Sequence, residues 1–397
     1  MKNKKEVKTW PVVVLLLMMY VIVAMSDNFK GIFVPAFKSE FGIDNTQIGY
    51  VLMASLFAYA VFQYVGGILI GKVGYKKVIA LGFLIAMAAI GVIVSCKSYI
   101  LLIAGLFILH TGMAMFNVGV NTLGPVLPVA STAVLMSMIT FSYGVSSTTI
   151  QKLVGYLLFR GVAWRNFFIF MLCATGALFV YLLMIKIPEK EKDDSNVKMN
   201  ASELWKNKIL WLYILLAGFY LASDYGTGNW FANYMDEGYG LDANNRAFYV
   251  SLFFGTMTFG RLIGGFIADK LGHFRSIIIF SVLATVFIFT GVTLGESGLL
   301  VIAIGGFFFS LIFPVTITTI STVFKDNASY AIGMILMAGT LISMLVNFFI
   351  GVLNDAIGVQ NAYYAIAVCL GLTTIFTICV RKNVEGNKDE KSVCIHE

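Results

Sequence analysis

Few side chains inside the long apolar segments of this sequence can carry charge, and these few define the chemistry that is open to the protein. Asp27 and Lys30 lie three residues apart, so a helix places them on one face. An ionisable group in a membrane span costs about 2.5–3.5 kcal/mol and normally faces a cavity or a partner. The pair is either a mutual ion pair or a binding site for a solute or a proton. We interpret Asp27, Asn28 and Lys30 as candidate substrate-binding residues.

A second group of polar residues lies in the apolar segment 209–234, where Asp224 falls near the middle. An acid, an amide and an aromatic ring together offer acceptors for sugar hydroxyls and a face for the ring. A carboxylate in a poorly hydrated site favours its neutral form, which suits a proton carrier. We therefore predict that Asp224 is proton-sensitive, with Asp27 or His110 as the next candidate; the alternative is a structural partner for Arg261 or Lys30. The binding candidates here are Tyr220, Asp224, Asn229 and Trp230.

A polar stripe is predicted on the apolar segment 99–127. At 100° per residue, His110, Asn117 and Asn121 fall within about 40° of one another on a helix. Such a stripe is typical of a helix that lines a substrate cavity. Interhelical hydrogen bonding, which Asn and His commonly provide in membranes, is the alternative. We include all three residues among the substrate-binding candidates.

Composition places these residues in a bilayer. The chain has 397 residues, of which 59% are hydrophobic and 12% charged, against about a quarter charged in soluble proteins. Its five cysteines form no Cys-x-x-Cys pair, so we expect neither a metal site nor a cofactor. A phosphate-binding loop for ATP and a Ser/His/Asp constellation are absent from the sequence, which argues against ATP drive and against an enzyme.

Twelve apolar segments are long enough to cross a membrane as helices. With the N-terminus inside, the connecting loops and tails place 20 Lys and Arg residues on the inner side and 5 on the outer side. This asymmetry predicts that both termini are cytoplasmic. It also argues against nucleic-acid binding as the reason for the +7 net charge. The segments are 10–36, 47–71, 77–96, 99–127, 131–158, 165–187, 209–234, 246–269, 275–294, 298–323, 328–353 and 360–380.

Two six-span halves are indicated by a polar linker and an internal repeat. The stretch 188–208 is rich in Lys, Glu, Asp and Asn, as in a solvated linker. Residues 66–74 recur at 264–272, and residues 116–121 recur at 313–318, with offsets of 198 and 197. Parallel halves with a substrate site between them are a transporter architecture. We predict bundles at 1–187 and 209–383, a linker at 188–208 and a cytoplasmic tail at 384–397.

The loop after the eighth span resembles the signature of the major facilitator superfamily, Gly-x-x-x-Asp-x-x-Gly followed by a basic residue. Here Gly265, Asp269, Gly272 and Arg275 occupy those positions, and the copy in the first half has Gly71 in place of the acid. The resemblance implies a fold of twelve transmembrane helices and a gating role for the cytoplasmic loops. The candidate gating residues are Gly67, Gly74, Arg261, Asp269, Gly272 and Arg275.

Several stretches are similar to the fucose permease type of sugar–proton symporter: residues 27–31 with Pro35, 112–121, 220–230 and 260–265. Matched on Pro35, the acidic residue of the first span in that type falls at Gly31, one turn after Asp27. The acidic residue of its fourth span falls at Asn117. The resemblance implies that the substrate is a sugar and that a proton accompanies it.

These observations together predict an all-α membrane protein of two pseudo-symmetric six-helix bundles in a major facilitator fold. We expect a secondary transporter of a small polar solute, a sugar with proton symport, working by alternating access as a monomer in the plasma membrane. The alternative is an organic-anion transporter that uses Lys30 and Arg261, because cations outnumber acids within the spans.

Overall fold

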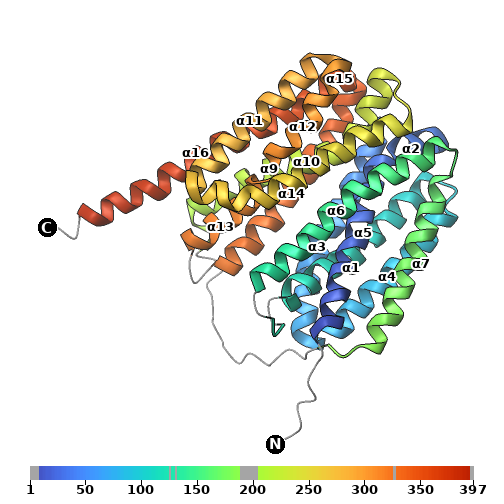
Figure 1. Cartoon of the computed structure of the whole chain (residues 1–397), viewed down its shortest axis with the longest axis horizontal. Coiled ribbons are helices and arrows are strands. Elements are labelled where there is room, and N and C mark those ends of the chain that lie inside the picture. Colours follow the sequence, from blue (N-terminus) through green and yellow to red (C-terminus); the bar gives the residue numbers. More distant parts are fainter. Residues whose placement is uncertain (1–8, 125–126, 130–131, 188–203, 325–327, 394–397) are drawn as a thin grey trace, which may run out of the picture. The chain divides into compact units, whose positions relative to one another are not determined.

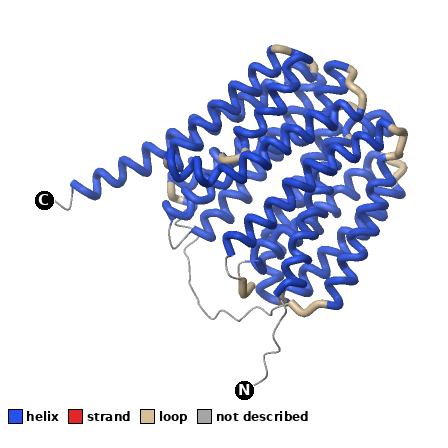
Figure 2. Tube along the Cα trace, viewed as in Figure 1, coloured by secondary structure: helices blue, strands red, loops and turns tan. Residues whose placement is uncertain are grey.

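The computed structural model describes residues 9–124, 127–129, 132–187, 204–324 and 328–393. Within these ranges every regular element is a helix (Figure 2). The chain divides into two compact units (Figure 1). The first comprises Met1–Ser195 and Asp242–Ser251, and the second comprises Asn196–Leu241 and Leu252–Glu397. The start of one helix, α10, therefore groups with the first unit.

The first unit is built from seven described helices before the polar linker. In this unit α1 packs on α6, and α5 packs on α3, α4 and α1. This arrangement brings together the three helices that carry its candidate site residues, α1, α5 and α6. The bounds are α1 Thr9–Ile32, α2 Val34–Phe41, α3 Asn45–Val73, α4 Tyr75–Ser95, α5 Tyr99–Leu123, α6 Thr132–Phe159 and α7 Trp164–Met184.

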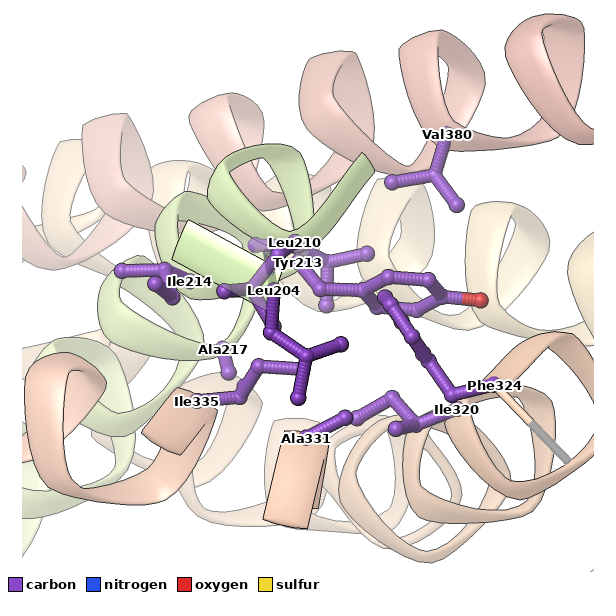
Figure 3. Packing of buried hydrophobic residues seen from close by; sticks show 11 residues of the cluster. Leu204, Leu210, Tyr213, Ile214, Ala217, Ile320, Phe324, Ala331, Ile335 and Val380 are labelled. Atoms are coloured by element: carbon purple, nitrogen blue, oxygen red, sulfur yellow. The ribbon is translucent and has the colours of Figure 1, made fainter. Parts of the chain in front are cut away.

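The second unit repeats this packing, with α9 on α14 in the place of α1 on α6. Its core at one end of α9 contains Leu210, Tyr213 and Ile214, which pack against Ile320 and Phe324 (Figure 3). The bounds are α9 Lys208–Tyr239, α10 Ala243–Leu271, α11 His273–Thr293, η2 Gly295–Gly298, α12 Leu299–Phe309, α13 Ile312–Phe324, α14 Ala328–Ile357, α15 Val359–Ala362 and α16 Tyr364–Val393.

Membrane-spanning length and apolarity are met by eleven helical segments of the described chain. The remaining predicted span, 131–158, coincides with α6, a helix of 28 residues. Three predicted spans are interrupted. The first breaks at Phe33, where Pro35 occupies the first turn of α2, the tenth breaks between α12 and α13, shortly before Pro314, and the twelfth breaks near its start at Tyr363, between α15 and α16. Proline has no backbone N–H to donate and clashes with the preceding turn, which explains the first two breaks.

The repeat seen in the sequence is also present in the backbone. Gly74 ends α3 with φ +85°, and Gly272 ends α10 with φ +82°, a left-handed conformation that other residues rarely adopt. The pairs Gly42/Gly240 and Gly161/Gly358 likewise share positive φ at offsets of 198 and 197. Equivalent turns thus begin and end equivalent helices in the two halves.

Small residues let α4 and α5 approach closely. A Cβ atom added to Gly112 would lie 2.9 Å from the Gly82 carbonyl oxygen and 3.2 Å from the Ala86 Cβ. Association of helices in a membrane depends on such close packing rather than on the hydrophobic effect. The crossing holds α5, which carries His110, Asn117 and Asn121, in a defined rotation.

A polar group outside the spans ties α2 to α7. Glu40 contacts the Arg165 guanidinium at 2.6 Å and accepts a hydrogen bond from Trp164 Nε1 at 2.6 Å. Arg165 also donates to the carbonyl oxygens of Val94, in the last turn of α4, and of Cys96, directly after α4. The Arg165 hydrogen bond lowers the pKa of the Glu40 carboxyl below its usual value of 4.5. This group fixes the ends of three helices.

We expect Glu40→Gln to lower the free energy of unfolding by about 0.5–1 kcal/mol at pH 7, since the side chain is 36% exposed and solvent screens the pair. A lowered folded-state pKa gives stability that is fully present above pH 4.5 and is lost as pH falls through the folded value. Denaturant unfolding in detergent at pH 7 and pH 4 measures this, with the exposed Glu296→Gln as control. A difference between wild type and Glu40→Gln that stays constant over this range would contradict the assignment.

Candidate functional site

A charged group buried in the first unit joins α1, α5 and α6. Asp27 Oδ1 lies 3.1 Å from Lys30 Nζ, so the two residues form the ion pair that their spacing allows. The other carboxylate oxygen accepts a hydrogen bond from the Tyr143 hydroxyl on α6 at 3.1 Å. His110 Nε2 on α5 lies 3.7 Å from Asp27 Oδ1. Three side chains that can bind or release protons therefore meet at one carboxylate.

Burial in this group is uneven. The side chains of Lys30 and His110 are 3% and 1% exposed, whereas that of Asp27 is 17% exposed. Of these three side chains, the carboxylate is thus the one that reaches solvent, and the Lys30 and His110 nitrogens are more deeply buried. A charge in such surroundings is stabilised by its partners rather than by water.

An amide group lies directly beside the charged group. Asn28 donates to Ser147 Oγ at 2.9 Å and accepts from Gln151 Nε2 at 2.7 Å. Gln151 is 1% exposed, and its Oε1 has no hydrogen-bond partner within the described chain. Sequence reasoning placed Asn28 among the site residues but missed Tyr143, Ser147 and Gln151. Their polarity within an apolar helix was the available signal.

The polar stripe on α5 faces α1 along its length. Asn117 Nδ2 and Asn121 Nδ2 lie 3.3 and 3.2 Å from the Tyr20 hydroxyl, and Asn121 also donates to Asn117 Oδ1 at 2.8 Å. Tyr20 was not among the predicted residues. The Tyr20 ring meets the Tyr143 ring edge-on, with 6.3 Å between the ring centroids. Because the Tyr143 hydroxyl donates to Asp27, this contact connects the polar stripe to the charged group. The stripe thus has interhelical hydrogen bonds, and Asn121 is also exposed.

In the second unit the structure brings three predicted residues together. Asp224 and Arg261 both lie within electrostatic range of the Tyr220 hydroxyl. Tyr220 is 1% exposed, and its hydroxyl donates to the Phe309 carbonyl at 3.1 Å. Asp224 itself is half-buried. An acid and a cation beside a buried tyrosine form a polar group on α9 and α10.

Asn229 and Trp230 belong to different surroundings. Asn229 donates to Asn347 Oδ1 on α14 at 3.2 Å, and Asn347 donates in turn to the Ser343 carbonyl at 3.0 Å. Trp230 is 1% exposed, and its Nε1 has no partner among the residues described. In this conformation the indole ring is packed and does not offer an open face to a sugar.

The candidate gating residues lie at the ends of α3 and α10. Gly74 and Gly272 form the two equivalent turns, and a Cβ added to Gly67 would meet nothing within 4 Å. Arg275 is exposed on the first turn of α11. The side chain of Asp269 lies outside the described part of the structure. Arg261, a gating candidate from the sequence, lies with Asp224 near Tyr220, and its Nη2 is 3.9 Å from Met257 Sδ.

A search of the described residues for three or more His, Cys, Asp or Glu side chains able to hold a metal ion finds none. The described cysteines, Cys96, Cys173, Cys369 and Cys379, are free thiols.

Two helical units related by an internal repeat, each with buried polar residues on facing helices, define a secondary transporter fold. Sequence comparison agrees, because the profile of the Major Facilitator Superfamily matches residues 16–304. The chain belongs to this superfamily.

Relatives and solved structures cover most of the chain. The glucose/galactose transporter of Brucella abortus is 22% identical over an alignment of 372 positions, which covers 89% of this chain and 90% of the relative. A putative glucose/galactose transporter of Helicobacter pylori is 24% identical, covering 85% and 88%. A probable sulfoacetate transporter of Cupriavidus necator is 23% identical, covering 68% and 67%.

Structural similarity extends over both units. The FucP transporter in its outward conformation has a TM-score of 0.65 at 17% identity, covering 93% of this chain and 98% of FucP. The inward-open xylose transporter XylE of E. coli has a TM-score of 0.77 at 12% identity, covering 94% and 96%. These similarities establish the fold, with its twelve-helix architecture.

Proposed function

We propose that this protein is a sugar–proton symporter that works by alternating access in the plasma membrane as a monomer. The observation that carries the proposal is the buried group around Asp27, in which a carboxylate, an imidazole, an ammonium and a phenol meet within hydrogen-bonding or ion-pair distance. Ionisable groups that are buried within membrane-spanning helices are typical of proton pathways in transporters. The glucose/galactose relatives support a hexose as the solute.

Within each unit, the proposal assigns sugar binding to the predicted polar residues. Amide groups can donate hydrogen bonds to sugar hydroxyls and accept them, carboxylates can accept them, and buried groups of this kind reject solutes that leave them unpaired. Gln151 Oε1 is an acceptor without a partner in the described chain. The predicted substrate-binding residues are Asp27, Asn28, Lys30, His110, Asn117, Asn121, Tyr220, Asp224, Asn229 and Trp230.

The experiment is uptake of radiolabelled glucose or galactose into proteoliposomes with an inwardly directed proton gradient. With one proton per sugar, a gradient of one pH unit supports about tenfold accumulation, because each unit is worth about 1.4 kcal/mol. A protonophore should remove the accumulation. Uptake that never exceeds the equilibrium level, with a proton gradient and either sugar, would contradict the proposal.

An organic-anion carrier is the second candidate, and the similarity to a probable sulfoacetate transporter favours it. Lys30 and Arg261 would bind the anion. In the structure Lys30 is already engaged by Asp27 at 3.1 Å, which supports the sugar assignment instead. A thermal-shift screen of purified protein against glucose, galactose, sulfoacetate and small carboxylates discriminates between the two, since a ligand that binds the folded state raises its stability.

For topology we propose a cytoplasmic N-terminus, C-terminus and 188–208 linker, on the basis of the Lys and Arg distribution. In a background without native cysteines, a cysteine at position Asp194 or Lys388 should not react with a membrane-impermeant maleimide added to intact cells. Both should react after permeabilisation. Labelling of either position in intact cells would overturn this topology.

A further inference from the structure

His110 on α5 is held in one orientation by its own helix. Its Nδ1 lies 2.8 Å from the Leu106 carbonyl oxygen, which can only accept a hydrogen bond. Nδ1 therefore carries a hydrogen, and in the neutral imidazole Nε2 carries the lone pair. The ring is fully buried, with 0% of the residue exposed. Its free nitrogen is thus aimed in a fixed direction.

That direction is toward Asp27. Nε2 has no hydrogen-bond partner within the described chain, and the nearest acid oxygen, Asp27 Oδ1, lies 3.7 Å away. A lone pair and a carboxylate oxygen are both acceptors, so without a proton between them they repel. One added proton converts this contact into a charge-assisted N–H···O hydrogen bond. One proton can therefore be bound between His110 Nε2 and Asp27 Oδ1, and the neutral imidazole does not supply it.

The polar side chains that influence the charge of the imidazole come from two helices, α1 and α6. On α1, Asp27 favours a protonated ring and Lys30 opposes it, while on α6 Tyr143 donates to Asp27 Oδ2. The other helices packed on α5 are α3 and α4. Within their bounds neither contains Asp, Glu or His, and their charged residues, Lys72 on α3 and Lys76 and Lys77 on α4, lie near the helix ends. The balance at His110 is therefore set by the competition of Lys30 and His110 for a single carboxylate.

We propose that His110 Nε2 is the proton acceptor of the transport cycle and that Asp27 is the carboxylate through which the proton arrives. This inference rests on the proposed function and specifies the proton-binding atom. Asp27 is 17% exposed and His110 1%, so a proton from water reaches the ring by way of the carboxylate. The O–H bond of the protonated Asp27 carboxyl breaks as the Nε2–H bond forms, and Asp27, again a carboxylate, becomes the counterion of the imidazolium. Lys30 then shares the Asp27 carboxylate with the imidazolium, so its ammonium becomes available to a hydroxyl of the solute.

The test uses the small number of histidines in the chain. The sequence has three, so replacing His273 and His396 with Gln leaves His110 alone. Solid-state NMR of this protein in liposomes, with ring-¹⁵N histidine, reports each nitrogen separately. We expect Nδ1 to stay protonated at all pH values and Nε2 to titrate. Its midpoint should match that of the pH dependence of glucose or galactose uptake to within about half a pH unit.

Two substitutions at His110 complete the test. Asn can keep the bond to the Leu106 carbonyl, and Gln can place an amide nitrogen near the Nε2 position, yet neither binds a proton. Both should reduce the accumulation ratio from about tenfold to about one at a gradient of one pH unit. His273→Gln, on the exposed start of α11, is the matched control and should accumulate sugar as wild type does.

The outcomes separate the inference from the proposed function. If wild-type protein accumulates glucose or galactose with a proton gradient but Nε2 does not titrate where uptake changes, the inference is wrong and symport stands. The inference is also overturned if the His110 variants still accumulate sugar with wild-type pH dependence. If wild type shows no gradient-driven uptake of either sugar, the proposed function itself fails. Should the variants not fold, the NMR titration of the native histidine still decides.

Discussion

Asp27→Asn is expected to abolish proton-driven accumulation of sugar. The substitution removes the charge that pairs with Lys30 at 3.1 Å and faces His110 Nε2 at 3.7 Å, and it leaves an amide that does not carry protons. The accumulation ratio in proteoliposomes should fall from about tenfold to about one at a gradient of one pH unit. Lys30, 3% exposed, then lacks its anion, so stability should drop by about 3–5 kcal/mol.

The matched control for this prediction is the double variant Asp27→Asn, Lys30→Met. It removes both charges together, and a buried pair replaced as a whole costs far less than a pair broken on one side. Thermal unfolding in detergent should therefore recover most of the loss, while accumulation should remain absent. If Asp27→Asn alone accumulates sugar, the carboxylate has no part in coupling. If the double variant restores transport as well as stability, the role of Asp27 is structural.

Asp224→Asn is expected to weaken sugar binding without changing the number of protons carried per sugar. Asp224 is half-buried beside Tyr220 and Arg261, where it can accept hydrogen bonds from a solute. A hydrogen bond to a charged group contributes about 1.5–3 kcal/mol, so the dissociation constant for glucose or galactose should rise by about tenfold or more. Isothermal titration with purified protein measures this change.

The control for Asp224 is Glu237→Gln, which removes an exposed carboxylate from the same helix and should leave sugar affinity within about twofold, as expected for a surface charge. The sequence favoured Asp224 as the proton carrier, whereas the contacts around Asp27 favour the first unit. The proton-to-sugar ratio, measured from uptake at several gradients, decides between these alternatives. If Asp224→Asn carries no proton per sugar while its affinity for the sugar is unchanged, Asp224 is the proton carrier.

Helices and their order were predictable from the sequence because apolar length is imposed by the bilayer. A span needs about 20 apolar residues, and twelve such segments are evident without any knowledge of packing. The internal repeat was also evident, since equivalent turns need equivalent glycines, as Gly74 and Gly272 show. The breaks at Phe33 and before Pro314 were missed, because hydropathy does not register a change in backbone direction. Helix α16 continues to Val393, into the predicted tail 384–397.

The partners of the polar residues were decided by tertiary structure. Helical periodicity shows that Asp27 and Lys30 share a face, because that relation is local, and the ion pair follows from it. It does not show which residue of another helix meets that face. Tyr143 lies 116 residues from Asp27 and Gln151 lies 123 residues from Asn28, so their contacts depend on how α6 is rotated against α1. Likewise the sequence marks His110 as polar, but only the packing of α5 directs its free nitrogen at a carboxylate.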